Sequence, residues 1–113
     1  MSIGPKLNWP LTLEERQRVA DGAGGFSETW VALGQLWGEL RTRGVGDGAV
    51  AAGELHRVRY RIIVRGSGEG ELTRPKTGQR FRTANRVFDI DAVTEMDATG
   101  RYLIVWAREE RLA

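Results

Sequence analysis

Four arginines share one face of a short stretch whose other residues are mostly apolar. The stretch reads His56-Arg57-Val58-Arg59-Tyr60-Arg61-Ile62-Ile63-Val64-Arg65. Alternate side chains of a strand lie about 6.6 Å apart on one face, so we expect an apolar inner face and an outer arginine row in which Ile63 is the one apolar member. Such a row can follow a phosphate backbone, pair with carboxylates of a neighbouring chain, or lie in solvent. The sequence leaves these three alternatives open.

Carboxylates that could pair with such a row occur elsewhere in the chain. Asp89, Asp91 and Glu95 fall on one face of a second alternating stretch, and Glu14 and Glu15 stand near the N-terminus. Carboxylates on one strand can hold Mg²⁺ or Ca²⁺. A solvated acidic face, or one that meets the arginine face of a neighbouring strand or subunit, is the simpler interpretation. The candidate residues for a subunit or partner interface therefore include Arg57, Arg59, Arg61, Asp89 and Asp91.

Catalytic chemistry lacks its usual groups. His56 is the only histidine and cysteine is absent, so the chain offers no histidine pair, thiolate metal site or disulfide. No serine has a base beside it in the sequence. The segment Gly66-Ser67-Gly68-Glu69-Gly70 lacks the Lys-Ser/Thr pair of a phosphate-binding loop. We predict that the protein is not an enzyme and has no catalytic residue, cofactor or metal site.

Length and composition indicate one small domain. The 113 residues include 15 glycines, and 41% are hydrophobic, which suits a turn-rich β-domain. The formal net charge is only +2 and does not by itself indicate a nucleic-acid partner. No apolar run reaches the about 18 residues of a membrane-spanning helix, and residues 1–10 lack a signal-peptide pattern. These features predict a soluble protein made in the cytoplasm, with no membrane partner.

Hydrophobic alternation and turn residues predict six strands. The expected strands are Leu11–Ala20, Phe26–Arg41, Leu55–Arg65, Gln79–Thr83, Arg86–Met96 and Arg101–Glu109, with a hairpin turn at Ala84-Asn85. A capping-box pattern makes a helix the alternative for the first element, but the glycine-rich turn at Asp21–Gly25 requires an antiparallel partner and favours a strand. Gly34 predicts a bulge, because one extra residue returns Trp30 and Trp37 to the same side of their strand.

The predicted fold is all-β: a small six-stranded antiparallel β-barrel or sandwich. Two connections, 42–54 and 66–78, are longer than most loops of compact domains. We expect both to act outside the core, and residues 42–54 to contain at most a short helical turn.

The large apolar residues are expected to divide between the core and the surface. Trp30 and Trp106 are predicted to lie in the core, whereas Trp9 and Trp37, beside loop or polar segments, are candidates for a subunit or partner interface. Phe88, Ile90 and Ala92 are expected to share the inner face of their strand, opposite the carboxylates.

Four features follow one another in an order that resembles a known family. They are Arg16 and Val19 before the turn Asp21–Gly25; Ser27-Glu28-Thr29-Trp30-Val31 with Trp37 after it; His56-Arg57-Val58-Arg59-Tyr60-Arg61; and Gly78–Arg82 followed by Arg86-Val87-Phe88-Asp89-Ile90, Val93 and Asp97. The chain resembles the head–tail joining family of tailed bacteriophages and gene transfer agents, also called head closure or stopper proteins. The resemblance covers residues 11–110, which form the expected connector domain, and leaves 1–10 as an N-terminal extension.

The resemblance implies a structural protein of the virion neck, assembled in the bacterial cytoplasm. It implies a homo-oligomeric ring of six or twelve copies between the portal or adaptor protein and the tail terminator or tail tube protein, retaining packaged double-stranded DNA. The connection at 42–54 would face the central channel. Its candidate residues are Arg43, Gly44, Asp47, Val50 and Glu54.

A nucleic-acid-binding barrel of the OB type is the alternative function. In such a protein the arginine row would lie beside Tyr60, Phe81 or Phe88 as platforms on which bases stack. Phe88 alternates with carboxylates, which disfavours this alternative.

Overall fold

The computed structural model describes residues 4–42, 58–68 and 70–110, which contain strands and turns and no helix. The strands are β1 (Trp9–Ala20), β2 (Phe26–Thr42), β3 (Arg59–Arg65), β4 (Arg80–Thr83), β5 (Arg86–Glu95) and β6 (Tyr102–Glu110). The all-β prediction is confirmed, and the first element is a strand rather than a helix. The helical turn predicted between the second and third strands lies outside the described residues.

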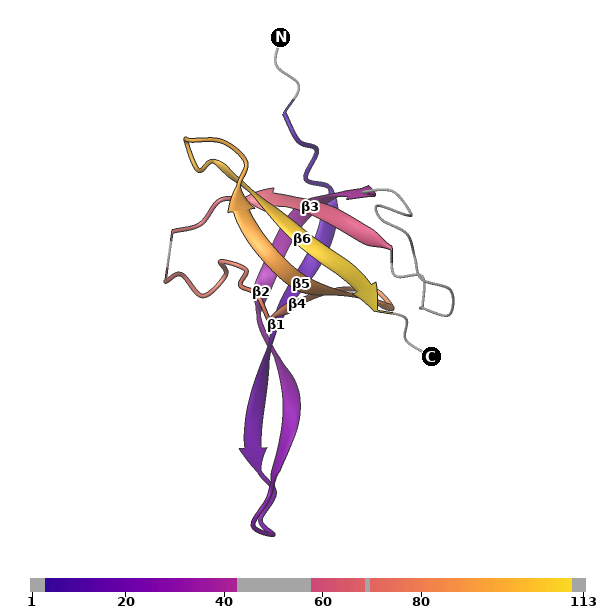
Figure 1. Cartoon of the computed structure of the whole chain (residues 1–113), viewed down its shortest axis with the longest axis vertical. Coiled ribbons are helices and arrows are strands. Elements are labelled where there is room, and N and C mark those ends of the chain that lie inside the picture. Colours follow the sequence, from indigo (N-terminus) through magenta and orange to yellow (C-terminus); the bar gives the residue numbers. More distant parts are fainter. Residues whose placement is uncertain (1–3, 43–57, 69, 111–113) are drawn as a thin grey trace, which may run out of the picture.

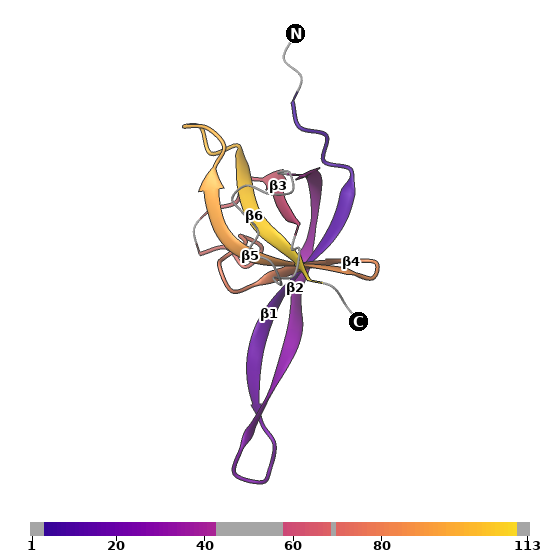
Figure 2. The ribbon, with the colours of Figure 1, turned by 45° about the vertical axis from the view of Figure 1, so that its right-hand side comes forward.

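The six strands form one antiparallel sheet that closes on itself. Their order is β1-β2-β3-β6-β5-β4, and β4 pairs with β1 to complete the ring (Figure 1, Figure 2). The contact between β1 and β4 that closes the sheet is short: it consists of the pairs Thr12–Arg82, Leu13–Phe81 and Glu14–Arg80. The predicted turn at Ala84-Asn85 joins β4 to β5, and Ala84 takes a φ of 50°, the left-handed conformation that such a turn requires.

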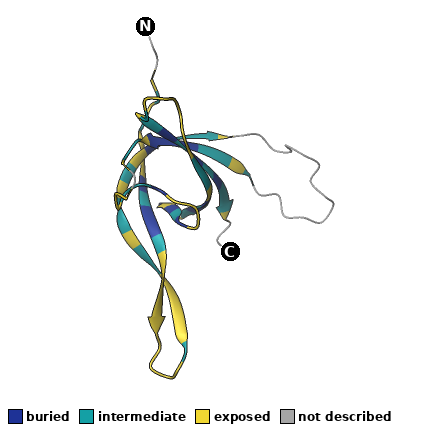
Figure 3. Cartoon of the chain, turned by 60° about the vertical axis from the view of Figure 1, so that its left-hand side comes forward, coloured by how far each residue is buried: buried dark blue, intermediate teal, exposed yellow. Residues whose placement is uncertain are grey.

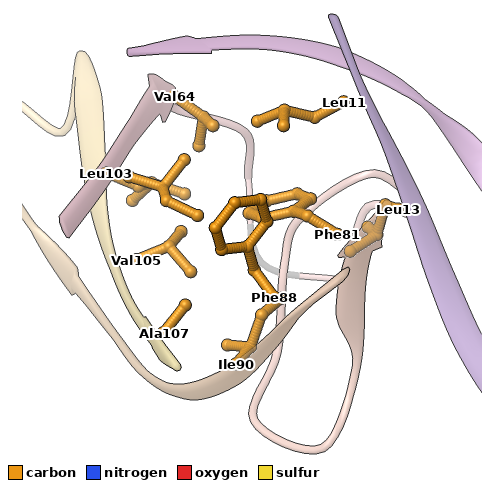
Figure 4. Packing of buried hydrophobic residues seen from close by; sticks show 10 residues of the cluster. Leu11, Leu13, Val64, Phe81, Phe88, Ile90, Leu103, Val105 and Ala107 are labelled. Carbon is orange, nitrogen blue, oxygen red and sulfur yellow. The ribbon is translucent and has the colours of Figure 1, made fainter. Parts of the chain in front are cut away.

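The core fills the inside of this ring. Figure 4 shows side chains from five strands converging on two phenylalanines, Phe81 and Phe88, which are fully buried. The rings of Tyr60 and Phe88 meet edge to face, with centroids 5.2 Å apart. On β6, Leu103, Val105 and Ala107 point inward, so the residues between them point outward.

The bulge predicted at Gly34 lies beside that residue. Leu13 pairs with Gly34 and Glu14 with Ala32, so Leu33 is the extra residue of β2. Because Trp37 then pairs with Pro10 and Trp30 with Arg16, both tryptophans lie on the same side of β2, as the sequence predicted, and this side is the outer face.

A second bulge, which the sequence did not reveal, changes the faces of β5. Ile90 pairs with Ala107 and Ala92 with Trp106, so Asp91 is the extra residue. The expectation that Ala92 shares the inner face with Phe88 and Ile90 is wrong, because the bulge turns Ala92 outward.

The core predictions for two tryptophans are also wrong. Trp30 and Trp106 are half-buried on the outer face rather than in the core, because the inward positions of their strands belong to smaller residues such as Val105. Ile63 is buried although it lies on the arginine side of β3. The N-terminal segment explains this: the Lys6 backbone N–H donates to Glu39 on β2, and Gly4 lies beside Tyr102 on β6, so the segment crosses β3.

Strands β1 and β2 extend far beyond the barrel. β1 pairs with β4 only through Thr12–Glu14, and β2 pairs with β3 only through Gly38–Thr42. Residues 15–31 therefore form a two-stranded ribbon, here called the finger, that projects from one end of the barrel (Figure 1). Most of its residues are exposed, as the mainly yellow colour of the finger in Figure 3 shows.

The core predicts a clear effect of truncating Phe88. We expect Phe88→Ala to lower the free energy of unfolding by about 3–5 kcal/mol, because the cavity would lie at the centre of the barrel. Urea unfolding followed by circular dichroism measures this. Leu72→Ala is the control, since Leu72 is 65% exposed and its truncation should change stability by less than about 0.5 kcal/mol. Equal effects of the two substitutions would contradict the described core.

Candidate functional site

A buried ion pair fixes the finger to the barrel. Glu14 on β1 and Arg80 on β4 are directly opposed, and the Arg80 Nε lies 2.7 Å from a Glu14 carboxylate oxygen. Their side chains are only 10% and 13% exposed. The Arg80 guanidinium also stacks on the Trp30 ring at 4.0 Å, a cation–π contact that ties β4 to the finger's second strand. The finger therefore leaves the barrel in a defined direction.

The same outer face of the finger carries alternating arginine and aromatic side chains. Arg16 lies 5.0 Å from the Trp30 ring, and Arg18 lies 4.7 Å from the Phe26 ring. An exposed ion pair joins Arg16 to Glu28 at 3.6 Å. We call this side, formed by Arg16, Arg18, Phe26, Glu28 and Trp30, the ladder face. Its charged and aromatic groups already contact one another within the chain.

The opposite side of the finger carries no charged side chain along its outer part. The register places Glu15 there, opposite Val31, and five uncharged residues that we call the neutral face: Gln17, Val19, Ser27, Thr29 and Val31. At the root of this side, the Glu15 carboxylate accepts a hydrogen bond from the Gln79 amide at 3.4 Å. Val19 is 47% exposed. The inward positions of β1, such as Leu11 and Leu13, continue along the strand into this face, but beyond the barrel no second layer covers it in the described structure.

Hydrogen bonds fix the tip of the finger. The Asp21 carboxylate accepts hydrogen bonds from the backbone N–H groups of Ala23 and Gly25, at 2.8 and 3.0 Å. Gly22 and Gly24 take φ values of 81° and 86°, which only glycine adopts without strain. The Ala23 bond, followed by the Gly25 bond, lowers the pKa of Asp21 below its ordinary value of 3.8. The predicted glycine turn is thus a preorganised loop.

The arginine row of β3 is only partly exposed. Arg59 and Arg65 are exposed, whereas Arg61 is half-buried and lies 6.0 Å from the Trp106 ring. The Arg61 Nε is buried and has no hydrogen-bond partner among the described residues. Cross-strand pairing sets Arg59 opposite Arg108 and Arg61 opposite Arg41, so like charges face each other on this surface.

The candidate carboxylates serve partners inside the chain. Asp91 accepts hydrogen bonds from the Arg108 Nε at 2.9 Å to each oxygen, and this bonding raises the pKa of Arg108. Asp89 is half-buried and pairs across strands with Arg80 and Arg108. Glu14 is bound by Arg80. Asp91 and Glu14 therefore already have arginine partners within the chain.

The two candidate interface tryptophans lie in different places. Trp9 begins β1 at the barrel end opposite the finger, with the Arg86 guanidinium 5.6 Å from its ring. Trp37 is 54% exposed on the outer face of β2. It lines an open groove of about 420 Å³ together with Leu7, Leu36 and residues of the β3–β4 connection such as Ser67 and Thr73.

Sequence reasoning missed a polar cluster at the Trp9 end of the barrel. Arg86 donates two hydrogen bonds to the Glu109 carboxylate, at 2.8 and 3.1 Å, and a third to the Tyr60 hydroxyl at 3.1 Å. Bonding to Glu109 raises the pKa of Arg86, and burial raises that of Tyr60. All three residues occupy inward positions of their strands at the mouth of the core. Each of them alternates with buried residues along its strand, and this pattern could have indicated an inward side chain. It could not have indicated the partners, because they lie on strands far apart in the sequence.

The remaining candidates either fall outside the described residues or take a different role. Five candidate channel residues (Arg43, Gly44, Asp47, Val50 and Glu54) and Arg57 lie outside the described residues, so their roles stay predictions. Phe81 and Phe88 are fully buried and cannot serve as stacking platforms for bases. The OB-type alternative therefore loses two of its three aromatic residues.

The described part of the chain shows no group of three or more His, Asp or Glu side chains placed to hold a metal ion. No helix long and apolar enough to cross a membrane occurs among the described residues.

Comparison with known proteins identifies the family. Residues 3–110 match the family described as phage head completion protein. The chain belongs to that family. It is also similar to a chain in the virion structure of a native gene transfer agent particle, with 44% identity and a TM-score of 0.79 over 97% of this chain and 100% of that chain. Among proteins with curated descriptions, none matches.

A more distant structure shares the fold of this head completion protein. Protein SF1141 from Shigella flexneri 2a, solved in solution, is 22% identical, with a TM-score of 0.68 over 96% of each chain. The predicted family resemblance is confirmed, and the head completion protein is a structural protein of the phage head–tail class.

The Glu14–Arg80 pair predicts a strong dependence of stability on one carboxylate. We expect Glu14→Ala to lower the free energy of unfolding by about 3 kcal/mol, because it leaves the Arg80 charge buried without its partner. Glu28→Ala, which removes the partner of an exposed pair, should cost less than about 1 kcal/mol. Urea unfolding compares the two. The double variant Glu14→Leu with Arg80→Met should recover most of the lost stability. Equal costs for the two single variants would contradict the role of the Glu14–Arg80 pair as a brace between the finger and the barrel.

The tip of the finger predicts a local pH dependence. Because the pKa of Asp21 is lower in the folded state, its contribution to the tip is present above pH 3.8 and is lost as the pH falls through the folded pKa. NMR titration of the carboxyl group should therefore show a midpoint below 3.8, with the Ala23 and Gly25 amide resonances moving in step. Asp21→Ala should speed amide hydrogen exchange at these residues, whereas Asp21→Asn, which keeps an acceptor oxygen, should speed it less. A midpoint at or above 3.8 would contradict the tip geometry.

Proposed function

We propose that this protein closes the head of a phage or gene transfer agent particle after DNA packaging. The observation that carries the proposal is its similarity, along nearly the whole chain, to a chain within a gene transfer agent virion. In the proposed assembly, six or twelve copies form a ring at the virion neck. One side of the ring meets the portal or adaptor protein, and the other meets the tail terminator or tail tube protein.

The arrangement of the two arms supports this role. The finger leaves one end of the barrel, whereas Thr42 and Val58, the described residues on either side of 43–57, lie away from the finger. A ring subunit with arms at both ends can contact a component on each side. The barrel between them is held by its own core and needs no partner to define its shape.

The proposed mechanism is steric. Packaged double-stranded DNA would be retained when residues 42–54 of several copies crowd the central channel, with Arg43, Gly44, Asp47, Val50 and Glu54 as the channel-facing residues. Docking of the tail would then bias these segments towards an open arrangement. No bond is made or broken in this process, so it requires no catalytic residue. Assembly would take place in the bacterial cytoplasm.

Removing the gene from the phage or gene transfer agent that encodes the protein tests the proposal. We expect heads without tails, and packaged DNA that becomes sensitive to nuclease, with both defects repaired by the wild-type chain supplied in trans. Electron microscopy and nuclease protection measure the two defects separately. Tailed, DNA-filled particles at normal abundance would overturn the proposed function.

A second variant separates channel closure from tail docking. Replacing residues 43–54 by a Gly/Ser segment of equal length keeps the distance that the connection must span. We expect these particles to contain the neck protein but to protect less DNA from nuclease. Unchanged protection would exclude residues 43–54 as the closing element while leaving the neck role intact.

A further inference from the structure

We propose that the neutral face of the finger packs into the Trp37 groove of the next copy. The inference rests on the proposed ring, since it assigns the surfaces by which neighbouring copies would join. It commits to one occupant of the groove: a second copy of this chain.

The neutral face has the composition of a buried surface, although no part of the described chain covers it. Its five residues are uncharged, and the one carboxylate beside them, Glu15 opposite Val31, is bonded to Gln79; the ladder face holds Arg16, Arg18 and Glu28. Depletion of charge is typical of the centre of a protein interface. A two-stranded ribbon is also only marginally stable alone. The chain nevertheless holds this ribbon in one shape through the Asp21 tip and the Glu14–Arg80 brace, and such preorganisation lowers the cost of binding.

The groove is the matching exposed apolar surface on the barrel. It is lined by Leu36 and Trp37 of β2, Leu7 of the N-terminal segment, and Thr73 of the β3–β4 connection, with Arg65 and Glu71 as its charged members. Leu72, next to two of the lining residues, is 65% exposed and Trp37 is 54% exposed. A groove whose lining includes three large apolar residues and only two charged ones can accept an uncharged surface with β-branched residues.

The groove and the neutral face are two different surfaces of the chain. The groove borders the part of β2 that contains Leu36 and Trp37, whereas the neutral face continues the inward side of β1 along the finger. A contact between them is therefore heterologous, joining different patches on the two copies, and such contacts generate rings when the rotation closes.

The exposed area is consistent with a partner. The chain presents 7684 Å² of accessible surface. A compact monomer of its mass would present about 6,200 Å², and a standard interface buries about 800 Å² on each partner. The uncovered finger contributes to this surplus, which exceeds the area that one standard interface buries on a partner.

Cross-linking between introduced cysteines tests the contact, because the natural chain has no cysteine. The test variant carries Val19→Cys and Leu72→Cys, both at exposed positions, in otherwise complete particles. We expect a short bis-maleimide to convert the monomer band into covalent dimers and higher multiples on a denaturing gel. Each single-cysteine variant should give no such series. The matched control, Glu28→Cys with Leu72→Cys, places the thiol on the ladder face at a similar distance along the finger and should cross-link far less.

The outcomes separate this inference from the proposed function. Tailed, DNA-filled particles that contain the double variant but give no multiples would overturn the finger–groove contact and leave the neck role standing. Cross-links from the thiol introduced by Val19→Cys to a different virion protein would likewise overturn it, because the finger's partner would not be a second copy. Particles that lack the protein altogether would overturn both.

Discussion

The unequal length of neighbouring strands is the constraint on which the shape of this protein depends. β1 and β2 have 12 and 17 residues, whereas their outer neighbours β4 and β3 have 4 and 7. A barrel closes only where every strand has two neighbours, so it ends where β4 and β3 end. The surplus of β1 and β2 can then pair only with itself. The finger is thus a direct consequence of strand length, and its uncovered neutral face is a consequence of the finger.

Charged groups serve this architecture by fixing its ends rather than by forming a reactive centre. Arg86 and Glu109 close one mouth of the apolar core, and Glu14 with Arg80 braces the finger at its root. In each case a guanidinium also contacts an aromatic ring, which allows the charge to lie among apolar residues. Such pairs orient structural elements, which is what a protein acting through shape and contact requires.

Much of the fold follows from local patterns in the sequence. Alternation identified all six strands, the glycines located the tip of the finger, and Gly34 located the first bulge. The candidate site was less predictable. The pairing of Asp91 with Arg108, and of Glu14 with Arg80, joins residues that are 17 and 66 positions apart. No local pattern indicates which of several carboxylates faces a given arginine, because strand order and register decide it.

The sequence by itself determined the strand content, the turns and the family, since each is written in spacing that a short segment carries alone. Tertiary structure decided which side of each strand met the core. The bulge at Asp91 turned Ala92 outward, and the N-terminal segment covered Ile63, because both effects arise from a neighbouring strand or a crossing segment. It also decided that residues 15–31 stand free of the barrel, since that depends on where the neighbouring strands end.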